Sequence, residues 1–430
     1  MADEQLTQPI AEQILDSIGS SGQPPNYGFQ FFTAGIDDYL SVIEHEFLEK
    51  KIKRGDKALK MVVAGYGSGK THFLYCVREI AFKHNYVVSY VSLTHDATPF
   101  HDKSAVYKAV ISNMLYPMEP EELMSGYELG IENFIKTWYA NKLNEFKINS
   151  SNPGEIEERL EEYMGYLNQH NYENTSFSNA VREAFLALKD RRDSDFSLIM
   201  QWLKAEGIMT GAKGHNRFGI LQPIDKKNAF DMLRSLIQWI KDIGYTGMIL
   251  LFDEVEQRAS LGSQQHRNLL GNLKELVDEC SLGKIKSTMF FYAVPDTNFL
   301  TGNTGTHVAL NQRLAGTFVP FDDHFGQKIF LENVTGTSKS IMLEIGIKLS
   351  HIYEIAYEVR FDVVIIEEAV GNIVDSTVEA KFAAAGTLRL LVQSLVRAFQ
   401  YLQKKDGMRL DKAQSDEIVQ KMARTESTGE

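Results

Sequence analysis

Apolar and polar positions follow two different periods along this chain. Nearly continuous apolar runs at 59–64, 247–252 and 288–293 predict strands that are buried on both faces. Residues 86–93 alternate and are rich in β-branched side chains, which predicts one more strand, the second of four in chain order. Strands of this kind occur in parallel sheets covered by helices on both sides. The pattern therefore predicts an α/β fold with a parallel sheet as its core.

A long helical stretch separates the second predicted strand from the third. Apolar side chains recur with the period of amphipathic helices over 131–139 and over 229–240. The gap is much longer than a compact sheet needs, so we expect a large helical insertion at about 103–243. From residue 337 onward the pattern is again helical, and its apolar stripes are typical of a core rather than of a cofactor site.

With 430 residues, the chain is long enough for two or three domains. We expect an N-terminal helix and connector at 1–26, a core at 27–322 that contains the insertion, and a helical domain at 323–430. The two cysteines, Cys76 and Cys280, are too few for a disulfide framework and too isolated for a zinc site. Both are expected to be buried thiols.

The remaining composition narrows the class of protein. The net charge of −12 argues against DNA binding through bulk electrostatics, and leaves a local basic groove, or one formed on assembly, as the route to DNA. No stretch reaches the roughly 18 apolar residues of a membrane helix, and the polar segment 1–13 is not a signal peptide. We therefore expect a cytoplasmic protein with no membrane partner.

The turn after the first strand carries the pattern of a phosphate-binding loop. The turn and the first helical positions after it are Gly65, Tyr66, Gly67, Ser68, Gly69, Lys70, Thr71 and His72. The glycines let successive backbone N–H groups point at a polyphosphate, beside the positive end of the helix dipole. Lys70 would reach the β- and γ-phosphates, and Thr71 would bind Mg²⁺. Ala64 stands where the strict motif has its first glycine, and alanine is the smallest substitute.

The third strand ends in two acids, Asp253 and Glu254. At the carboxyl end of a parallel strand, Asp253 would lie in the crevice where ligands of open α/β sheets bind. It would hold Mg²⁺ there, usually through water. Glu254 would orient and polarise the attacking water, as in NTPases that hydrolyse with their own glutamate. The competing interpretation is a buried strand that ends in a solvated acidic turn.

The fourth strand is followed by a proline and then by Asp296, Thr297 and Asn298. A polar side chain at this position of an open α/β sheet could sense the γ-phosphate. An ordinary capped proline turn explains the same residues equally well. Which of the three would act as the sensor stays open.

Four segments taken together resemble one family. They read Gly-Tyr-Gly-Ser-Gly-Lys-Thr-His-Phe-Leu at 65–74, Val-Ser-Leu at 91–93, Gln-Trp-Leu-Lys-Ala-Glu-Gly at 201–207, and Ile-Gly-Tyr-Thr-Gly-Met-Ile-Leu-Leu-Phe-Asp-Glu-Val-Glu at 243–256. The family is the ATP-binding proteins of bacterial BREX phage-exclusion systems, of the BrxC/BrxD kind, which are similar to origin-recognition-like AAA+ ATPases. The resemblance covers roughly residues 32–397. It implies a P-loop NTPase core of the AAA+ type with a C-terminal helical lid.

The resemblance also implies further site residues and ligands. Arg313 is where such proteins carry an arginine that reaches the nucleotide of a neighbouring subunit. Arg389, at the start of a lid helix, resembles a second sensor arginine. Either arginine could instead form an ordinary surface ion pair. ATP rather than another nucleotide is implied only by the resemblance, as are a homo-oligomer and other defence-system proteins as partners.

Two functions fit these observations. The leading hypothesis is a Mg²⁺-dependent ATPase that assembles or remodels a phage-defence complex acting on DNA. The alternative is a nucleotide-dependent oligomerisation switch or scaffold that scarcely turns over, and such a switch would not need Glu254. Phosphate transfer to a small substrate is disfavoured, because no short lid with clustered arginines follows the loop.

Overall fold

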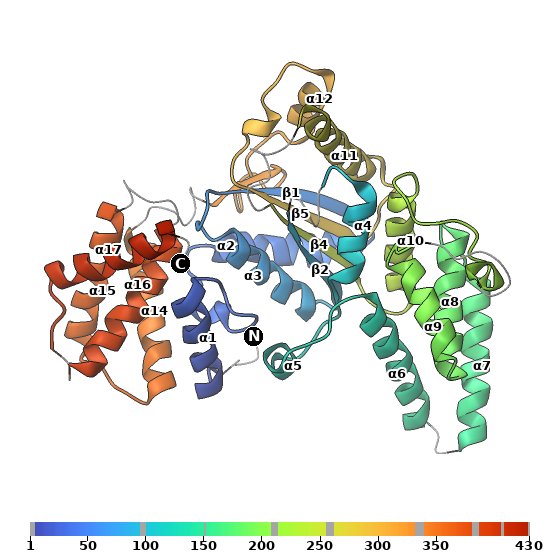
Figure 1. Cartoon of the computed structure of the whole chain (residues 1–430), viewed down its shortest axis with the longest axis horizontal. Helices are drawn as coiled ribbons and strands as arrows, with labels where there is room; N and C mark the ends of the chain where they lie inside the picture. The colour runs from blue at the N-terminus through green and yellow to red at the C-terminus, as the bar shows by residue number, and fades with distance from the viewer. Residues whose placement is uncertain are drawn as a thin grey trace.

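The computed structural model describes residues 5–94, 100–149, 152–207, 214–254, 262–331, 339–380, 387–405 and 408–428. Figure 1 shows a central sheet with a group of insertion helices on one side and a bundle of C-terminal helices on the other. Among the described helices, none is long and apolar enough to cross a membrane.

In the described part of the chain, the strands form one six-stranded sheet in the order β3-β2-β4-β5-β1-β6. The strands are β1 (Lys57–Val63), β2 (Tyr86–Leu93), β3 (Met114–Leu115), β4 (Gly247–Glu254), β5 (Thr288–Val294) and β6 (Lys328–Phe330). Neighbouring strands are parallel except for the β2–β3 pair. The four predicted strands are confirmed to within two residues at each end. The two edge strands were not predicted, because two or three residues carry no readable period.

The side chains of β1 alternate between two hydrophobic cores. Leu59, Met61 and Val63 belong to the core that the sheet shares with the insertion, whereas Val62 belongs to the core shared with the C-terminal helices. All residues of β5 are buried. Burial on both faces explains the continuous apolar runs and confirms the mixed α/β class with a mostly parallel sheet.

In the described part of the long insertion between β2 and β4, every element except β3 is a helix. Its α-helices are α4 (Lys103–Ser112), α5 (Pro120–Ser125), α6 (Ile131–Asn149), α7 (Pro153–Gln169), α8 (Thr175–Lys189), α9 (Asp193–Leu203) and α10 (Ala229–Asp242). Asn152 and Asn174 cap α7 and α8 by accepting backbone N–H bonds, which satisfies donors that a helix start leaves unpaired. Trp138 and Trp239 meet edge to face, with ring centroids 5.3 Å apart, in the core of the insertion.

A C-terminal helical bundle follows the sheet. It comprises α14 (Lys339–Tyr357), α15 (Val363–Ala380), α16 (Thr387–Lys404) and α17 (Lys412–Thr428). The N-terminal helix α1 (Gln8–Ser21) packs against α14 and α16, and Figure 1 shows it lying alongside this bundle. The first helix is therefore joined in space to the last part of the chain.

The remaining described helices are neither α-helices of the insertion nor part of the C-terminal bundle. They are the 3-10 helices η1 (Phe29–Phe32), η3 (His215–Phe218) and η5 (Asn298–Leu300), the π-helix η2 (Ile43–Ile52), and the α-helices α2 (Asp37–Val42), α3 (Lys70–Lys83), α11 (Ser263–Leu282) and α12 (Gly305–Arg313). α3 follows the glycine-rich turn and covers the sheet on the side of the C-terminal bundle, as its buried side chains show.

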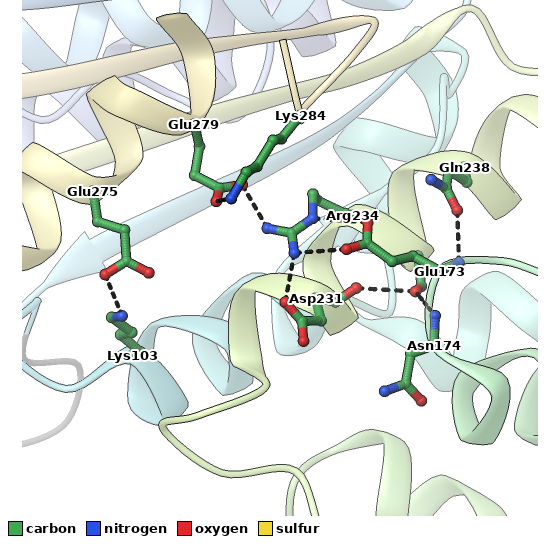
Figure 2. Close-up of polar contacts among 10 residues, drawn as sticks. Lys103, Glu173, Asn174, Asp231, Arg234, Gln238, Glu275, Glu279 and Lys284 are labelled. Carbon is green, nitrogen blue, oxygen red and sulfur yellow. Dashed lines mark hydrogen bonds and ion pairs between the residues drawn. The ribbon is translucent and has the colours of Figure 1, made fainter. Parts of the chain in front are cut away.

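A buried arginine ties the insertion to α11. Figure 2 shows the guanidinium of Arg234, on α10, at the centre of three carboxylates. It donates to Glu173 at 2.7 and 2.8 Å, to Asp231 at 2.5 Å and to Glu279 of α11 at 2.5 Å. The side chains of Arg234 and Glu279 are only 8% and 7% exposed. Such a pair stabilises the fold only while both charges are present.

We predict that Arg234→Ala lowers the free energy of unfolding by about 3 kcal/mol, because it leaves the buried Glu279 carboxylate without its main partner. Denaturant unfolding followed by circular dichroism measures the change. Arg217→Ala is the matched control, because Arg217 pairs with Asp195 while 39% exposed and should cost at most about 1 kcal/mol. Equal losses in the two variants would contradict the prediction.

Candidate functional site

The turn between β1 and α3 adopts the tight backbone that its glycines allow. The φ angle is +65° at Gly67 and +89° at Gly69, in a region that residues with side chains rarely adopt. α3 begins directly afterwards at Lys70, so its unpaired N–H groups lie at the turn. Ala64 is not among the described residues with positive φ, and its N–H donates to Val294 of β5 at 3.1 Å. Glycine is therefore not required at that position.

Lys70 folds back over the turn. Its ammonium donates to the carbonyl oxygens of Ala64 and Gly65, at 2.8 and 2.9 Å. The ammonium of Lys70 therefore places a full positive charge beside the partial positive charge of the α3 N-terminus. An anion is the ligand that this combination attracts.

Thr71, the next residue, contacts the acid at the end of β4 directly. Its hydroxyl donates to Oδ2 of Asp253 at 2.7 Å, and the hydroxyl of Tyr90 on β2 donates to the same oxygen at 2.8 Å. Asp253 is only 3% exposed. Burial, and then the charge of Asp253, raise the pKa of Tyr90 well above its ordinary value, so Tyr90 stays a hydrogen-bond donor.

Tyr90 is a residue that the sequence did not single out. It belongs to β2, and β2 is the neighbour of β4, with Tyr90 in register with Leu251. Only the order of the strands reveals this neighbourhood. A tyrosine near the carboxyl end of a predicted strand is otherwise indistinguishable from a core residue.

A cavity of about 350 Å³ adjoins the turn. Its polar lining comes from the residues of the turn, from Lys70 and Thr71, and from Asp253 and Tyr90. Its apolar lining includes Phe32, Ala34, Ile36, Ile345, Leu388 and Val392. These apolar side chains come from the segment after α1 and from the C-terminal bundle. A ligand with a charged part and an apolar part fits such a lining.

Arg389 reaches the turn from the start of α16. It donates a hydrogen bond from Nη1 to the hydroxyl of Tyr66, and its Cζ lies 4.6 Å from the centroid of that ring. The stem of Arg389 passes against Gly22, where an added Cβ would lie 2.4 Å from its Cγ. Nε of Arg389 is buried and has no hydrogen-bond partner among the described residues. The structure thus brings Arg389 of the C-terminal bundle and the turn together.

His72 lines the cavity and packs against η1, and it does not present a charge there. Its Nε2 lies 2.7 Å from the hydroxyl of Thr33, which itself donates to the carbonyl of Phe29 at 2.9 Å. Because that hydroxyl has one proton, the imidazole donates from Nε2. Burial lowers the pKa of His72 to about 4. The neutral ring joins α3 to η1.

The other predicted residues lie elsewhere. Asp296 accepts a hydrogen bond from the backbone N–H of Asn298 at 2.6 Å, which is a local cap, while its neighbour Pro295 lines the cavity. Arg313 ends α12, where it pairs with Asp278 of α11 and lies outside the cavity lining. Glu254 closes β4, and its side chain lies outside the described residues.

The sheet order, the glycine turn that leads into α3, and the acid at the end of β4 are consistent with the P-loop NTPase class. The family described as BREX system ATP-binding protein BrxC/D matches residues 7–417. The chain belongs to this family and is therefore an ATP-binding protein of a BREX anti-phage system, which confirms the resemblance. No curated protein and no solved structure matches the chain significantly.

We predict that His72 makes the fold less stable in mild acid. Its pKa of about 4 in the folded chain lies below the ordinary value of about 6.5 in the unfolded chain. The unfolded chain therefore binds more protons between these values, and the free energy of unfolding falls as the pH drops. His72→Phe should reduce the loss between pH 7 and pH 5 by about 2 kcal/mol. Denaturant unfolding at both pH values measures it, and equal losses in both proteins would refute it.

Proposed function

We propose that this protein is a Mg²⁺-dependent ATPase of the AAA+ type, with the C-terminal bundle as its lid. The hydrogen bond between Thr71 and Asp253 carries the proposal, because it joins the phosphate-loop helix to the acid of a separate strand. A hydroxyl and a carboxylate in contact are oxygen ligands of the kind that Mg²⁺ prefers. The described residues therefore fit the metal.

The chain's own groups would hold the nucleotide in three ways. The turn amides and Lys70 bind phosphate oxygens after the ammonium releases the carbonyls of Ala64 and Gly65. Thr71 and Asp253 would hold the metal, which when bound would offset the negative charge that develops on the phosphates. Tyr90 keeps the carboxylate of Asp253 oriented. The apolar lining accepts the base.

Arg389 supplies a second positive charge from the lid. Its buried Nε has no partner among the residues that the structure describes, which supports an anionic ligand at this place. A guanidinium on the terminal phosphate stabilises the transition state of phosphoryl transfer. Glu254 follows Asp253 at the end of β4, and we assign it the orientation of the attacking water. Asp296, two residues after the end of β5, remains a candidate sensor.

We assign Arg313 to the site of a neighbouring subunit. Within its own chain it pairs with Asp278 and does not line the cavity, which supports a role outside that cavity. The ATP cycle would then require a homo-oligomer, and it would assemble or remodel a defence complex acting on DNA together with other BREX proteins. The net charge of −12 argues that any DNA contact is local or depends on the assembly.

We predict that Glu254→Gln lowers the steady-state rate of phosphate release by about 10²-fold or more, because the amide cannot act as a base. It should leave ATP binding within about twofold of the wild-type value. Lys70→Ala should instead weaken ATP binding, because it removes a phosphate contact. Phosphate release and equilibrium binding measure the two effects separately.

The same experiment discriminates the alternative function. Equal, near-zero rates in the wild-type protein and in Glu254→Gln would overturn the hydrolysis proposal. An ATP-dependent change in mass would then support an oligomerisation switch or scaffold. Lys136→Ala is a control, since Lys136 forms an exposed ion pair with Glu132 in the insertion and should leave the rate unchanged.

We predict that Arg313→Ala and Glu254→Gln are each inactive but complement each other when mixed. A subunit with Glu254 then receives the arginine from a neighbour that still carries Arg313. Recovery of phosphate release in the mixture, rising with protein concentration, supports a shared site. A rate no higher than the sum of the two separate variants would show that Arg313 does not act between subunits.

A further inference from the structure

Tyr66 has the most exposed side chain of the turn. It is 43% exposed, yet its ring and its hydroxyl both contact Arg389. The turn itself does not need an aromatic residue, because the phosphate contacts of such a loop come from its backbone. The side chain therefore serves something other than the cradle.

The contact occupies the guanidinium in two ways. The phenol oxygen accepts a hydrogen bond from Nη1, and the ring face attracts the cation at 4.6 Å. Gly22 lets the arginine stem pass, since any larger residue there would clash with Cγ. Tyr66 thus holds Arg389 at the edge of the cavity while Nε, which is buried, has no partner in the described part of the chain.

We propose that Tyr66 determines how strongly this site distinguishes a nucleoside triphosphate from a diphosphate. The inference rests on the proposed function and deepens it. A terminal phosphate offers the guanidinium bidentate hydrogen bonds in which both partners are charged, whereas the phenol is neutral and accepts a single bond. The third phosphate therefore displaces Tyr66 from Arg389. A diphosphate lacks that group and leaves the tyrosine–arginine contact in place.

Displacing Tyr66 from Arg389 costs free energy, and only binding of the triphosphate requires that displacement. The apparent affinity for a ligand falls by the fraction of protein in which its binding group is available. Tyr66 lowers that fraction for Arg389, so it weakens triphosphate binding and leaves diphosphate binding unaffected. It also keeps the start of α16 attached to the turn until the third phosphate is present.

The test is equilibrium binding of a non-hydrolysable ATP analogue and of ADP, both with Mg²⁺, to the full-length protein by calorimetry. Tyr66→Phe keeps the ring and removes the hydroxyl. It should tighten binding of the analogue about three- to tenfold, the range expected for one hydrogen bond, and change ADP binding less than twofold. Tyr66→Leu, which removes the ring as well, should tighten it further.

Two controls isolate the contact. In an Arg389→Ala background, Tyr66→Phe should have no effect, because the tyrosine then has no arginine to hold. Tyr166→Phe removes the hydroxyl of another exposed tyrosine, one that bonds Asp242 in the insertion, and should change neither affinity.

The outcomes separate this inference from the proposed function. Weaker or unchanged analogue binding in Tyr66→Phe, or an equal gain for ADP, would overturn the role of Tyr66. Wild-type binding of the analogue still supports ATP binding in that case, and phosphate release still decides hydrolysis. A wild-type protein that binds neither nucleotide would overturn both proposals.

Discussion

The hydrogen bond between Thr71 and Asp253 joins residues that are 182 positions apart, and the arrangement of the site depends on it. It forms because β1 and β4 run in the same direction on either side of β5, so their carboxyl ends meet at one edge of the sheet. Tyr90, from β2, holds the same carboxylate oxygen. Three strands thus converge on one buried charge, and each of them must keep its register.

Helices from both ends of the chain pack together beside the site. α1 packs on α14 and α16, and Gly22 at the end of α1 leaves room for the stem of Arg389. Lys348 of α14 donates to the carbonyl of Thr33 at 2.6 Å, and the hydroxyl of Thr33 accepts a hydrogen bond from His72. The turn and the residues beside it therefore contact the C-terminal bundle at two places, through Tyr66 and through Thr33.

The insertion is attached to the core by charge as well as by apolar packing. Arg234 clamps Glu279, and Lys103 of α4 pairs with Glu275 one turn earlier on α11, as Figure 2 shows. α11 is the first described helix after β4, so these pairs hold the element that follows the acid strand. The buried carboxylate of Glu279 holds α11 in one position, because moving the helix would leave that charge unpaired.

The sequence by itself determined the four longer strands, the helical insertion, the glycine turn and the pair of acids, because each rests on local period or on backbone freedom. The family match confirmed the resemblance carried by those motifs. Only the tertiary structure decided that Tyr90 shares the oxygen of Asp253 with Thr71, that Tyr66 holds Arg389, and that Arg234 meets Glu279. Those contacts depend on strand order and helix packing. Strand order and helix packing produce no periodic pattern in the sequence. The contacting residues belong to distant segments, which become neighbours only when the two hydrophobic cores form.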